Sequence, residues 1–90
     1  MDFEWDEAKR RSNIDKHGLD FRDALRIFDG RPRLDVGSSR GEEERTLSVA
    51  IFDERFAAVT WTWRGNDTIR IISVRRARRA EERQYRQLHS

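Results

Sequence analysis

The sequence predicts an α+β domain in which helices flank a small antiparallel sheet. Three consecutive segments rich in β-branched and aromatic residues, about 45–52, 56–63 and 68–75, are separated by short turn sequences, as expected for consecutive strands. Segments with helical caps and helical apolar spacing precede and follow them, at residues 6–29 and 77–88. Helices segregated from an antiparallel sheet are typical of the α+β class.

The composition indicates one folded domain spanning residues 1–90. Hydrophobic residues make up 36% of the chain and charged residues 40%, but the charges are mixed in sign, which favours folding over disorder. The chain has no cysteine, which excludes disulfides and thiolate chemistry. No apolar run approaches the roughly 20 residues of a membrane span, and the N-terminus does not resemble a signal peptide. We therefore expect a cytoplasmic protein without membrane association.

Positive charge is concentrated at the C-terminal end. The formal net charge is only +2, yet residues 75–90 contain six arginines and two glutamates. A basic end on a nearly neutral body indicates an acidic partner, with nucleic acid as the first candidate. All but two of the 19 basic residues are arginine. Such a bias also arises from genome composition, so each arginine has a second interpretation as a solvated surface charge.

The N-terminal residues predict a strand and a polar helix. Residues 2–5 alternate polar and apolar side chains, as in a short strand. Asp6 is a suitable N-cap for a helix that runs to about His17, with Gly18 as its C-terminal cap. Because so few of its residues are apolar, this helix either lies on the surface or uses its polar groups.

A second helix, over about residues 21–29, begins after the N-cap Asp20. Its apolar stripe, expected to cover the sheet, consists of Phe21, Ala24, Leu25 and Phe28. Residues 33–36 predict a short strand. Residues 37–44 are polar and rich in Gly, Ser and Glu, which predicts a loop.

Two turn sequences predict which side chains share a face of the sheet. Gly65-Asn66 is typical of a two-residue hairpin loop and would pair Trp61 with Arg70, and Asp53-Glu54 stands where a second two-residue turn is needed. The predicted aliphatic face, expected to meet the helices, consists of Leu47, Val49, Ile51, Phe56, Ile69 and Ile71. The predicted uncovered face consists of Thr46, Ser48, Trp61, Trp63, Arg70 and Ile72.

The C-terminal helix, predicted over residues 77–88, has a narrow inner line. That line consists of Ala77, Ala80, Gln84 and Leu88, with Tyr85 beside it. Its outer faces carry Arg78, Arg79, Arg83 and Arg86. Arg76, Arg78 and Arg79 are more simply an electrostatic footprint for nucleic acid than groups that do chemistry.

Arg70, His17 and Arg75 each have a functional and a structural interpretation. Arg70, in mid-strand, either contacts phosphate or forms a cation–π pair with Trp61. His17 either transfers protons or only caps the first helix. Arg75, at a strand end, either contacts phosphate or forms a surface ion pair.

Five further residues are candidates for nucleic-acid binding: Lys16, Trp61, Arg64, Arg76 and Tyr85. Trp61 can stack on an unpaired base or anchor a protein interface. Arg64 flanks a turn and has an equally good structural interpretation. Tyr85 can serve as a late acid or stacking group, although a tyrosine at the edge of the core is commoner. No Cys/His cluster or paired acidic motif has metal-ligand spacing, so we expect no metal and no other cofactor.

Motifs in both halves of the chain follow the order of a known family. The first half contains Phe3-Glu4-Trp5-Asp6-Glu7, Asn13, Lys16-His17-Gly18, Phe21, Ala24 and Phe28. The second half contains Arg64-Gly65, Ile69-Arg70-Ile71-Ile72-Ser73, Arg75, Ala77, Glu82 and Tyr85. Over nearly its whole length the chain resembles the BrnT-type toxins.

This resemblance implies a RelE-like fold, a small antiparallel sheet with two N-terminal helices and one C-terminal helix. It implies an endoribonuclease that cleaves RNA, inhibits translation and is neutralised by a cognate BrnA-like antitoxin. Metal-independent RNA cleavage needs a base for the 2′-hydroxyl proton, cations around the phosphorane and an acid for the leaving 5′-oxygen, and the candidates for catalysis are Arg70, His17 and Arg75. The nucleic acid expected at the five binding candidates is then RNA. The toxin–antitoxin complex is then expected to bind operator DNA through the antitoxin, and a dimer of toxin–antitoxin pairs is one candidate assembly.

Two other interpretations are open. A non-catalytic nucleic-acid- or protein-binding module would share the fold without turnover, and the sequence shows no decisive acid–base pair that excludes it. A decayed toxin, retained only as half of a regulatory complex, is the second. Incubation with RNA in EDTA tests the first, and expression without a partner tests the second.

Overall fold

The computed structural model describes residues 1–41 and 43–90 and contains a five-stranded sheet. Its elements in chain order are β1 (Asp2–Glu4), α1 (Glu7–His17), α2 (Phe21–Ala24), the 3₁₀ helix η1 (Leu25–Phe28), β2 (Leu34–Arg40), β3 (Glu43–Phe52), β4 (Arg55–Arg64), β5 (Thr68–Arg76) and α3 (Arg79–Leu88). The strands lie in the order β1-β5-β4-β3-β2. β1 pairs parallel with β5, and the other neighbours are antiparallel. The α+β class is confirmed, with one parallel pair at the edge.

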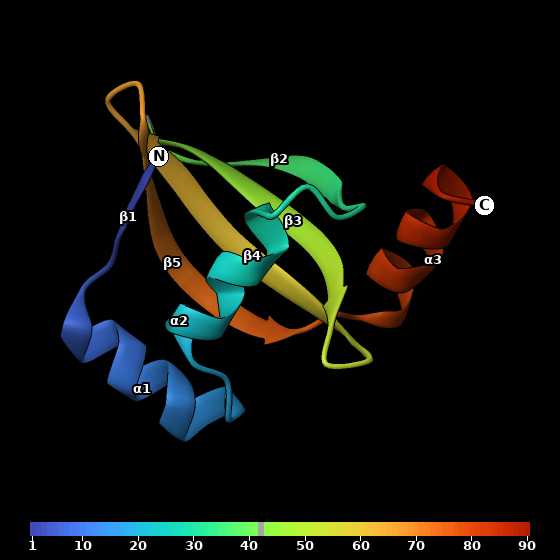
Figure 1. Ribbon diagram of the computed structural model, residues 1–90, viewed down its shortest axis with the longest axis horizontal. Coiled ribbons are helices and arrows are strands. Elements are labelled where there is room, and N and C mark those ends of the chain that lie inside the picture. Colours follow the sequence, from blue (N-terminus) through green and yellow to red (C-terminus); the bar gives the residue numbers. More distant parts are fainter. Residues whose placement is uncertain (42) are drawn as a thin grey trace.

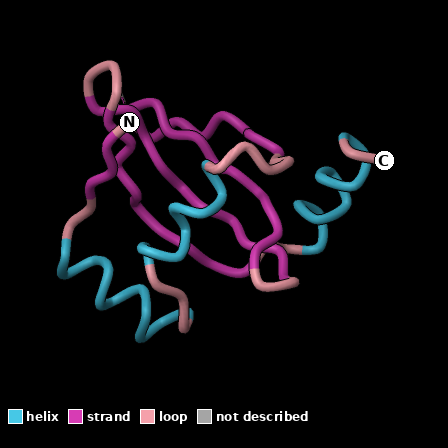
Figure 2. Tube along the Cα trace, in the orientation of Figure 1, coloured by secondary structure: helices cyan, strands magenta, loops and turns pink. Residues whose placement is uncertain are grey.

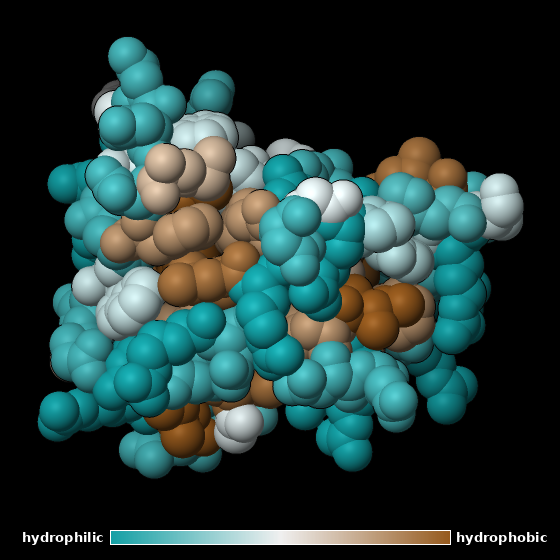
Figure 3. Space-filling model, viewed as in Figure 1, coloured by the Kyte–Doolittle hydropathy of each residue, from teal (hydrophilic) through white to brown (hydrophobic). Residues whose placement is uncertain are grey.

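The helices occupy different parts of the sheet. α1 and α2 both lie on one side of it, whereas α3 stands at its far end, near the turn between β3 and β4 (Figures 1 and 2). In the space-filling view of the same side, hydrophilic residues dominate and apolar residues show only in patches between them (Figure 3). Among the described residues, no helix is long and apolar enough to cross a membrane.

The N-terminal helices begin and end close to where the sequence predicts. The Asp6 side chain accepts hydrogen bonds from the backbone N–H groups of Ala8 and Lys9, at 2.9 and 3.2 Å, and so caps α1. Gly18 ends α1 with φ +67°, a left-handed conformation that glycine adopts without steric cost. The second helix is tighter than predicted, because α2 gives way to the 3₁₀ turn η1.

The loop predicted for residues 37–44 from their polar composition is wrong for the described residues. Instead of a loop, β2 extends to Arg40 and β3 begins at Glu43, with Ser38 opposite Arg45. Pairing with the long strand β3 draws these polar residues into the sheet, which the propensity of single residues does not capture. Glu42, which also belongs to the predicted loop, lies outside the described residues.

The two-residue turn at Asp53-Glu54 is confirmed. Phe52 pairs with Arg55 across it, and both turn residues have positive φ, at +52° and +65°. Such backbone is typical of a type I′ hairpin turn, although it is unfavourable for residues other than glycine. The Arg26 guanidinium bonds both carboxylate oxygens of Asp53, at 2.9 and 2.8 Å, and ties the turn to η1.

The prediction of a two-residue turn at Gly65-Asn66 is wrong, and the predicted faces of the sheet are wrong as a consequence. Arg64 pairs with Thr68, so three residues separate the strands. Trp61 consequently pairs with Ile71 rather than with Arg70. A slip of one residue reverses the face of every side chain in a strand, so each predicted face is divided between the two sides of the real sheet.

The core lies between the sheet and the N-terminal helices. Its buried members are Leu19, Phe21, Ala24, Ile27, Ala50, Phe52, Ala57, Val59, Trp61, Ile69, Ile71 and Val74, with Phe3, Trp5, Leu25 and Phe28 partly buried against them. Because these lists include Phe21, Ala24, Leu25 and Phe28, the predicted apolar stripe of the second helix is confirmed as part of the core that covers the sheet. Full burial of one large apolar side chain contributes about 1.5–3 kcal/mol.

β5 contains a β-bulge. Trp61 pairs with Ile71 and Thr60 pairs with Ser73, which leaves Ile72 as an extra residue without a partner on β4. Ile71 and Val74 both point into the core, so the bulge directs Ser73 and Arg75 to the same side as Arg70. In a regular strand Arg70 and Arg75, five positions apart, would lie on opposite faces.

Asn13 fixes α1 against β5 immediately after the bulge. Its side chain is buried, accepts from the Val74 N–H at 3.1 Å and donates to the Val74 carbonyl at 2.8 Å. It also donates to the Leu19 carbonyl at 2.8 Å. β1 pairs only with Thr68, Ile69 and Arg70, so Asn13 occupies the edge of β5 beyond the reach of β1.

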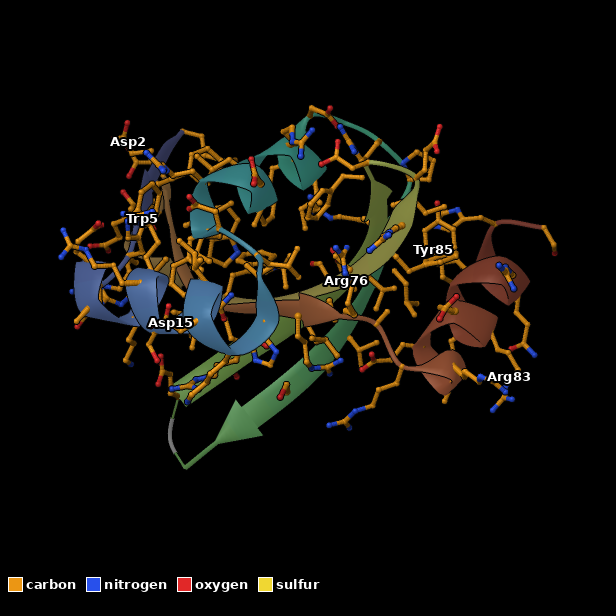
Figure 4. The ribbon with its side chains drawn as sticks, turned by 90° about the horizontal axis from the view of Figure 1, so that it is seen from below. Asp2, Trp5, Asp15, Arg76, Arg83 and Tyr85 are labelled. Carbon is orange, nitrogen blue, oxygen red and sulfur yellow. The ribbon has the colours of Figure 1, made fainter. Side chains whose placement is uncertain are left out.

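The predicted inner line of the C-terminal helix is wrong. Leu88 is exposed, and Tyr85 instead packs edge-on against Phe56, with ring centroids 5.2 Å apart. Tyr85 lies on the side of α3 that faces the sheet and Arg83 on the outer side (Figure 4). The sheet side of α3 is half polar, because Glu81 meets Arg75 there. Apolar spacing therefore did not identify it.

Replacing Asn13 with alanine is expected to destabilise the fold by about 3 kcal/mol or more. The substitution leaves one N–H and two carbonyl groups buried without partners, and each unsatisfied group costs about 1–3 kcal/mol. The measurement is urea unfolding monitored by circular dichroism. Ser12→Ala, one position earlier on α1, is the control and should change stability by less than about 0.5 kcal/mol. Equal stability of Asn13→Ala and wild type would contradict a stabilising role for the Asn13 hydrogen bonds.

Candidate functional site

The side of the sheet opposite α1 and α2, here called the open face, has a polar part that carries several arginines and an apolar part toward α3. Strand alternation places the following polar residues on it: Ser38, Arg45, Thr60, Thr62, Arg64, Arg70, Ser73 and Arg75. The apolar part includes Leu34, Val36, Leu47, Val49, Phe56 and Ala58. Four of the polar side chains carry hydroxyl groups and four carry guanidinium groups. Hydroxyl and guanidinium groups are hydrogen-bond donors that suit phosphate oxygens.

Two hollows meet at the bulge of β5. The first, of about 280 Å³, is the α1 hollow and is lined by Lys9, Ser12, Asn13, Lys16, His17, Ile72 and Ser73. The second, of about 290 Å³, is the open-face hollow and is lined by Ser38, Arg45, Thr60, Ile72 and Ser73. Because Ile72 and Ser73 line both, the two hollows adjoin at the bulge, and the surface along them, from the end of α1 to the open face, is here called the path.

Lys16 and His17 lie at the α1 end of this path. Both side chains are exposed, in the last turn of α1. Cations are favoured there by the helix dipole. The α1 hollow also contains Lys9, two helical turns before Lys16 on the same face of α1, so three basic side chains line this hollow.

Arg70 and Arg64 share one carboxylate on the open face. Arg70 Nη1 lies 3.4 Å from Glu4 Oε2, and Arg64 Nε lies 3.3 Å from Glu4 Oε1. The Arg70 side chain is 29% exposed, so it is reachable from solvent. Its predicted cation–π pair with Trp61 is wrong, because that ring lies on the opposite side of the sheet.

Arg75 is held more firmly than Arg70. Its Nη1 and Nη2 bond both Glu81 oxygens, at 2.9 and 2.8 Å. This hydrogen-bonded pair lowers the pKa of the Glu81 carboxyl from its usual 4.5 and raises the pKa of Arg75. Glu81 also accepts from the Arg78 N–H at 2.8 Å, which caps α3. The pair thus connects the open face to the C-terminal helix.

Three predicted RNA-binding residues lie away from this path. Trp61 is 4% exposed, and its Nε1–H donates to Ser48 Oγ at 2.8 Å in the core, so its faces are not available for stacking on a base. Arg76 points to the opposite side of β5 from Arg75. Tyr85 packs against Phe56 and lies 4.6 Å from the His89 ring, measured between centroids.

Four residues of the candidate site are not predicted from the sequence: Arg45, Thr60, Ser73 and Lys9. Arg45 follows directly after the predicted loop, and the predicted uncovered face contains the even-numbered residues of β3, Thr46 and Ser48, whereas the real open face contains the odd-numbered ones. The register of β3 against β4 is predicted correctly, but it groups Arg45 with Leu47 on the predicted covered face, so no sequence signal assigns Arg45 to the open face. Ser73 was not recoverable, because it reaches the open face only through the bulge.

The fold and the candidate site describe one class of protein, a small α+β protein whose open sheet face carries arginines and hydroxyl groups near an exposed histidine. A family profile described as "Ribonuclease toxin, BrnT, of type II toxin-antitoxin system" matches residues 5–81. The chain belongs to this BrnT family of ribonuclease toxins. Membership implies ribonuclease activity, an RNA substrate and an antitoxin partner, and confirms the resemblance found in the sequence.

A solved structure agrees with the profile. The chain is similar to the crystal structure of the Brucella abortus ribonuclease toxin BrnT, with 31% sequence identity and a TM-score of 0.68. The match covers 88% of this chain and 99% of that chain. A comparison with curated protein sequences gives no match. The arrangement of sheet and helices described above is therefore the BrnT fold.

Replacing Glu81 with glutamine is expected to destabilise the protein by about 1–2 kcal/mol at pH 7, because the charge-assisted bonds to Arg75 weaken. Glutamine can still accept from the Arg78 N–H, so the cap remains. The pKa of Glu81 is lowered in the folded state, so its contribution is complete well above pH 4.5 and is lost as the pH falls below that value.

Unfolding by urea at several pH values measures this effect. The stability difference between wild type and Glu81→Gln should shrink steadily below pH 4.5. Glu82→Gln, the next residue on α3, removes the same charge and is the control, with an expected change below about 0.5 kcal/mol. A Glu81→Gln difference that is constant from pH 7 to pH 3 would show that the ion pair does not stabilise the fold.

Proposed function

We propose that residues 1–90 form a single toxin domain, an endoribonuclease that cleaves RNA on the open face and thereby inhibits translation. The observation that carries this proposal is that the hollow of Lys16 and His17 adjoins, at Ile72 and Ser73, a hollow of the open face that contains Arg45. An RNA strand on this path has cations on both sides of β5.

Arg70 is the main contact to the scissile phosphate in this proposal. Its ion pair with Glu4 is partly exposed and has one long contact of 3.4 Å. Pairs of this kind contribute little, about 0–1 kcal/mol. A phosphate, which accepts two parallel hydrogen bonds from a guanidinium group, can therefore replace Glu4. In the transition state the same group stabilises the added negative charge on phosphorus.

His17 is the proposed proton-transfer group. When the 2′-oxygen attacks phosphorus, its proton must leave, and the departing 5′-oxygen must gain one. Imidazole exchanges protons readily near neutral pH. Lys16, beside His17, supplies positive charge along the strand. Arg75 contributes a fixed cation at the other end of the bulge, and we assign no separate base and acid between these groups.

Other residues extend the contact with RNA. Arg64 neighbours Arg70 on the open face and is 60% exposed, so it suits the backbone of flanking nucleotides. Arg76 and Tyr85 lie toward α3 and would contact RNA only beyond the cleaved bond. The proposed reaction uses protein cations and requires no metal ion or other cofactor.

The biological setting follows from the family. We infer that a cognate BrnA-like antitoxin neutralises this chain in the cytoplasm, that the complex binds operator DNA through the antitoxin, and that two toxin–antitoxin pairs assemble as a dimer. Expression of the chain alone should arrest growth, and co-expression with the antitoxin should restore it. Unimpaired growth on expression of the folded chain alone would instead favour a decayed toxin.

Purified wild type is expected to cleave single-stranded RNA in the presence of EDTA. Arg70→Ala should lower the cleavage rate about 10²–10³-fold, because it removes stabilisation of the phosphorane. His17→Ala should lower it about 10²–10⁴-fold, because it removes proton transfer. The rates are measured under single-turnover conditions, with binding of the same RNA measured separately.

Matched controls are available for both substitutions. Arg22→Ala removes an exposed arginine from α2, on the opposite side of the sheet, and His89→Ala removes the other histidine; both should cleave at the wild-type rate. Tight RNA binding by wild type without any cleavage would refute the nuclease and support a binding module. Cleavage abolished by EDTA and restored by a divalent cation would refute the metal-independent route.

A further inference from the structure

We propose that Arg45, together with the hydroxyl groups of Ser38, Thr60 and Ser73, forms a second phosphate subsite that holds the RNA backbone beyond the cleaved bond. This inference rests on the proposed function, and it assigns a binding role to a residue that neither the sequence motifs nor the site around Arg70 includes. The ligand class is a phosphodiester of single-stranded RNA.

Arg45 and Arg70 lie in one transverse row of the open face. Arg70 pairs with Thr62 of β4. Thr46 pairs with Trp61, so the next position along the two strands brings Arg45 beside Thr62. The two arginines are therefore two strand spacings apart, about 10 Å between their backbones. Thr62 donates to the Glu44 carbonyl at 2.7 Å and fixes the strand between them.

The resting position of Arg45 leaves a donor unsatisfied. Its Nε atom is buried and has no hydrogen-bond partner among the described residues. Its Nη2 donates to Glu43 at 2.9 Å, and the side chain is 22% exposed. A buried N–H without a partner is unfavourable, and an ion pair with a half-exposed glutamate holds the guanidinium only weakly. Rotation of Arg45 away from Glu43 toward a phosphate would satisfy both edges of the guanidinium group.

The open-face hollow has the chemistry of a phosphate site. Its lining contains one guanidinium, three hydroxyl groups and no acidic side chain. Nε and Nη2 of one arginine form a fork that matches two phosphate oxygens. The hollow adjoins the α1 hollow at Ile72 and Ser73, so a strand whose cleaved bond lies near His17 and Arg70 can continue into it. This continuity favours the substrate backbone over an unrelated anion.

Binding of a non-cleavable RNA tests the subsite. The probe is a fluorescein-labelled 2′-O-methyl oligonucleotide of about eight nucleotides, titrated with wild type at several salt concentrations and followed by anisotropy. Arg45→Gln should bind about five- to tenfold more weakly. Because one phosphate contact to a single strand contributes about 0.7 to the slope of log K against log salt, that slope should become shallower by about this amount.

Two further variants distinguish the paired hydrogen bonds of the Arg45 guanidinium group from the effect of its positive charge alone. Arg45→Lys should keep most of the salt slope but bind more weakly than wild type, since lysine lacks the paired donors. Arg22→Gln removes one arginine from the opposite side of the sheet and should bind within twofold of wild type. Equal losses in Arg45→Gln and Arg22→Gln, or wild-type binding by Arg45→Gln, would overturn the subsite.

A measurement on the wild type guards against misfolded variants. The Arg45 Nε–H resonance, assigned by its absence from spectra of Arg45→Lys, should shift on addition of the same oligonucleotide. An unchanged resonance at saturation would overturn the proposal. Failure of wild type to cleave the all-ribose oligonucleotide, with the Arg45 effects intact, would refute the nuclease and leave the subsite standing as an RNA-binding site.

Discussion

The extra residue in β5 determines the arrangement of the whole site. The bulge at Ile72 directs Arg70, Ser73 and Arg75 to one side of the sheet, whereas regular alternation would divide Arg70 from the other two. The Asn13 side chain hydrogen-bonds both the N–H and the carbonyl of Val74, two residues after the bulge. The same contact holds α1 against β5, so the irregular strand and the helix that carries His17 are fixed by one side chain.

The charged groups around the bulge divide into firm and weak contacts. Two short bonds between Arg75 and Glu81 attach α3 to the sheet. Arg70 and Arg45 are paired with Glu4 and Glu43 through partly exposed contacts that phosphate can replace. The cations nearest the proposed path are thus held loosely, and the cation that also supports the fold is held tightly. In the proposed complex, RNA would therefore replace only the weak ion pairs and leave the Arg75–Glu81 pair intact.

Local signals in the sequence predicted the helix caps at Asp6, Gly18 and Asp20 and the turn at Asp53-Glu54, because each depends on neighbouring residues alone. The turn after Arg64 and the bulge depend on pairing between strands, and an error of one residue there reversed the faces. The structure therefore has Trp61 in the core instead of on the uncovered face, and it has Arg45 on the open face, where the sequence does not predict it. His17, Lys16 and Arg70 are candidates from residue type and position, and their roles stay predictions. The structure places His17 and Lys16 in a hollow that adjoins the open face, on which Arg70 lies.

The most direct test is a crystal structure of the wild-type chain with the 2′-O-methyl oligonucleotide bound. Our account predicts phosphate groups along Ile72 and Ser73, between the end of α1 and Arg45, with the Arg70 guanidinium turned from Glu4 toward a phosphate. An oligonucleotide bound along α2 or the outer side of α3, with the open face empty, would contradict it.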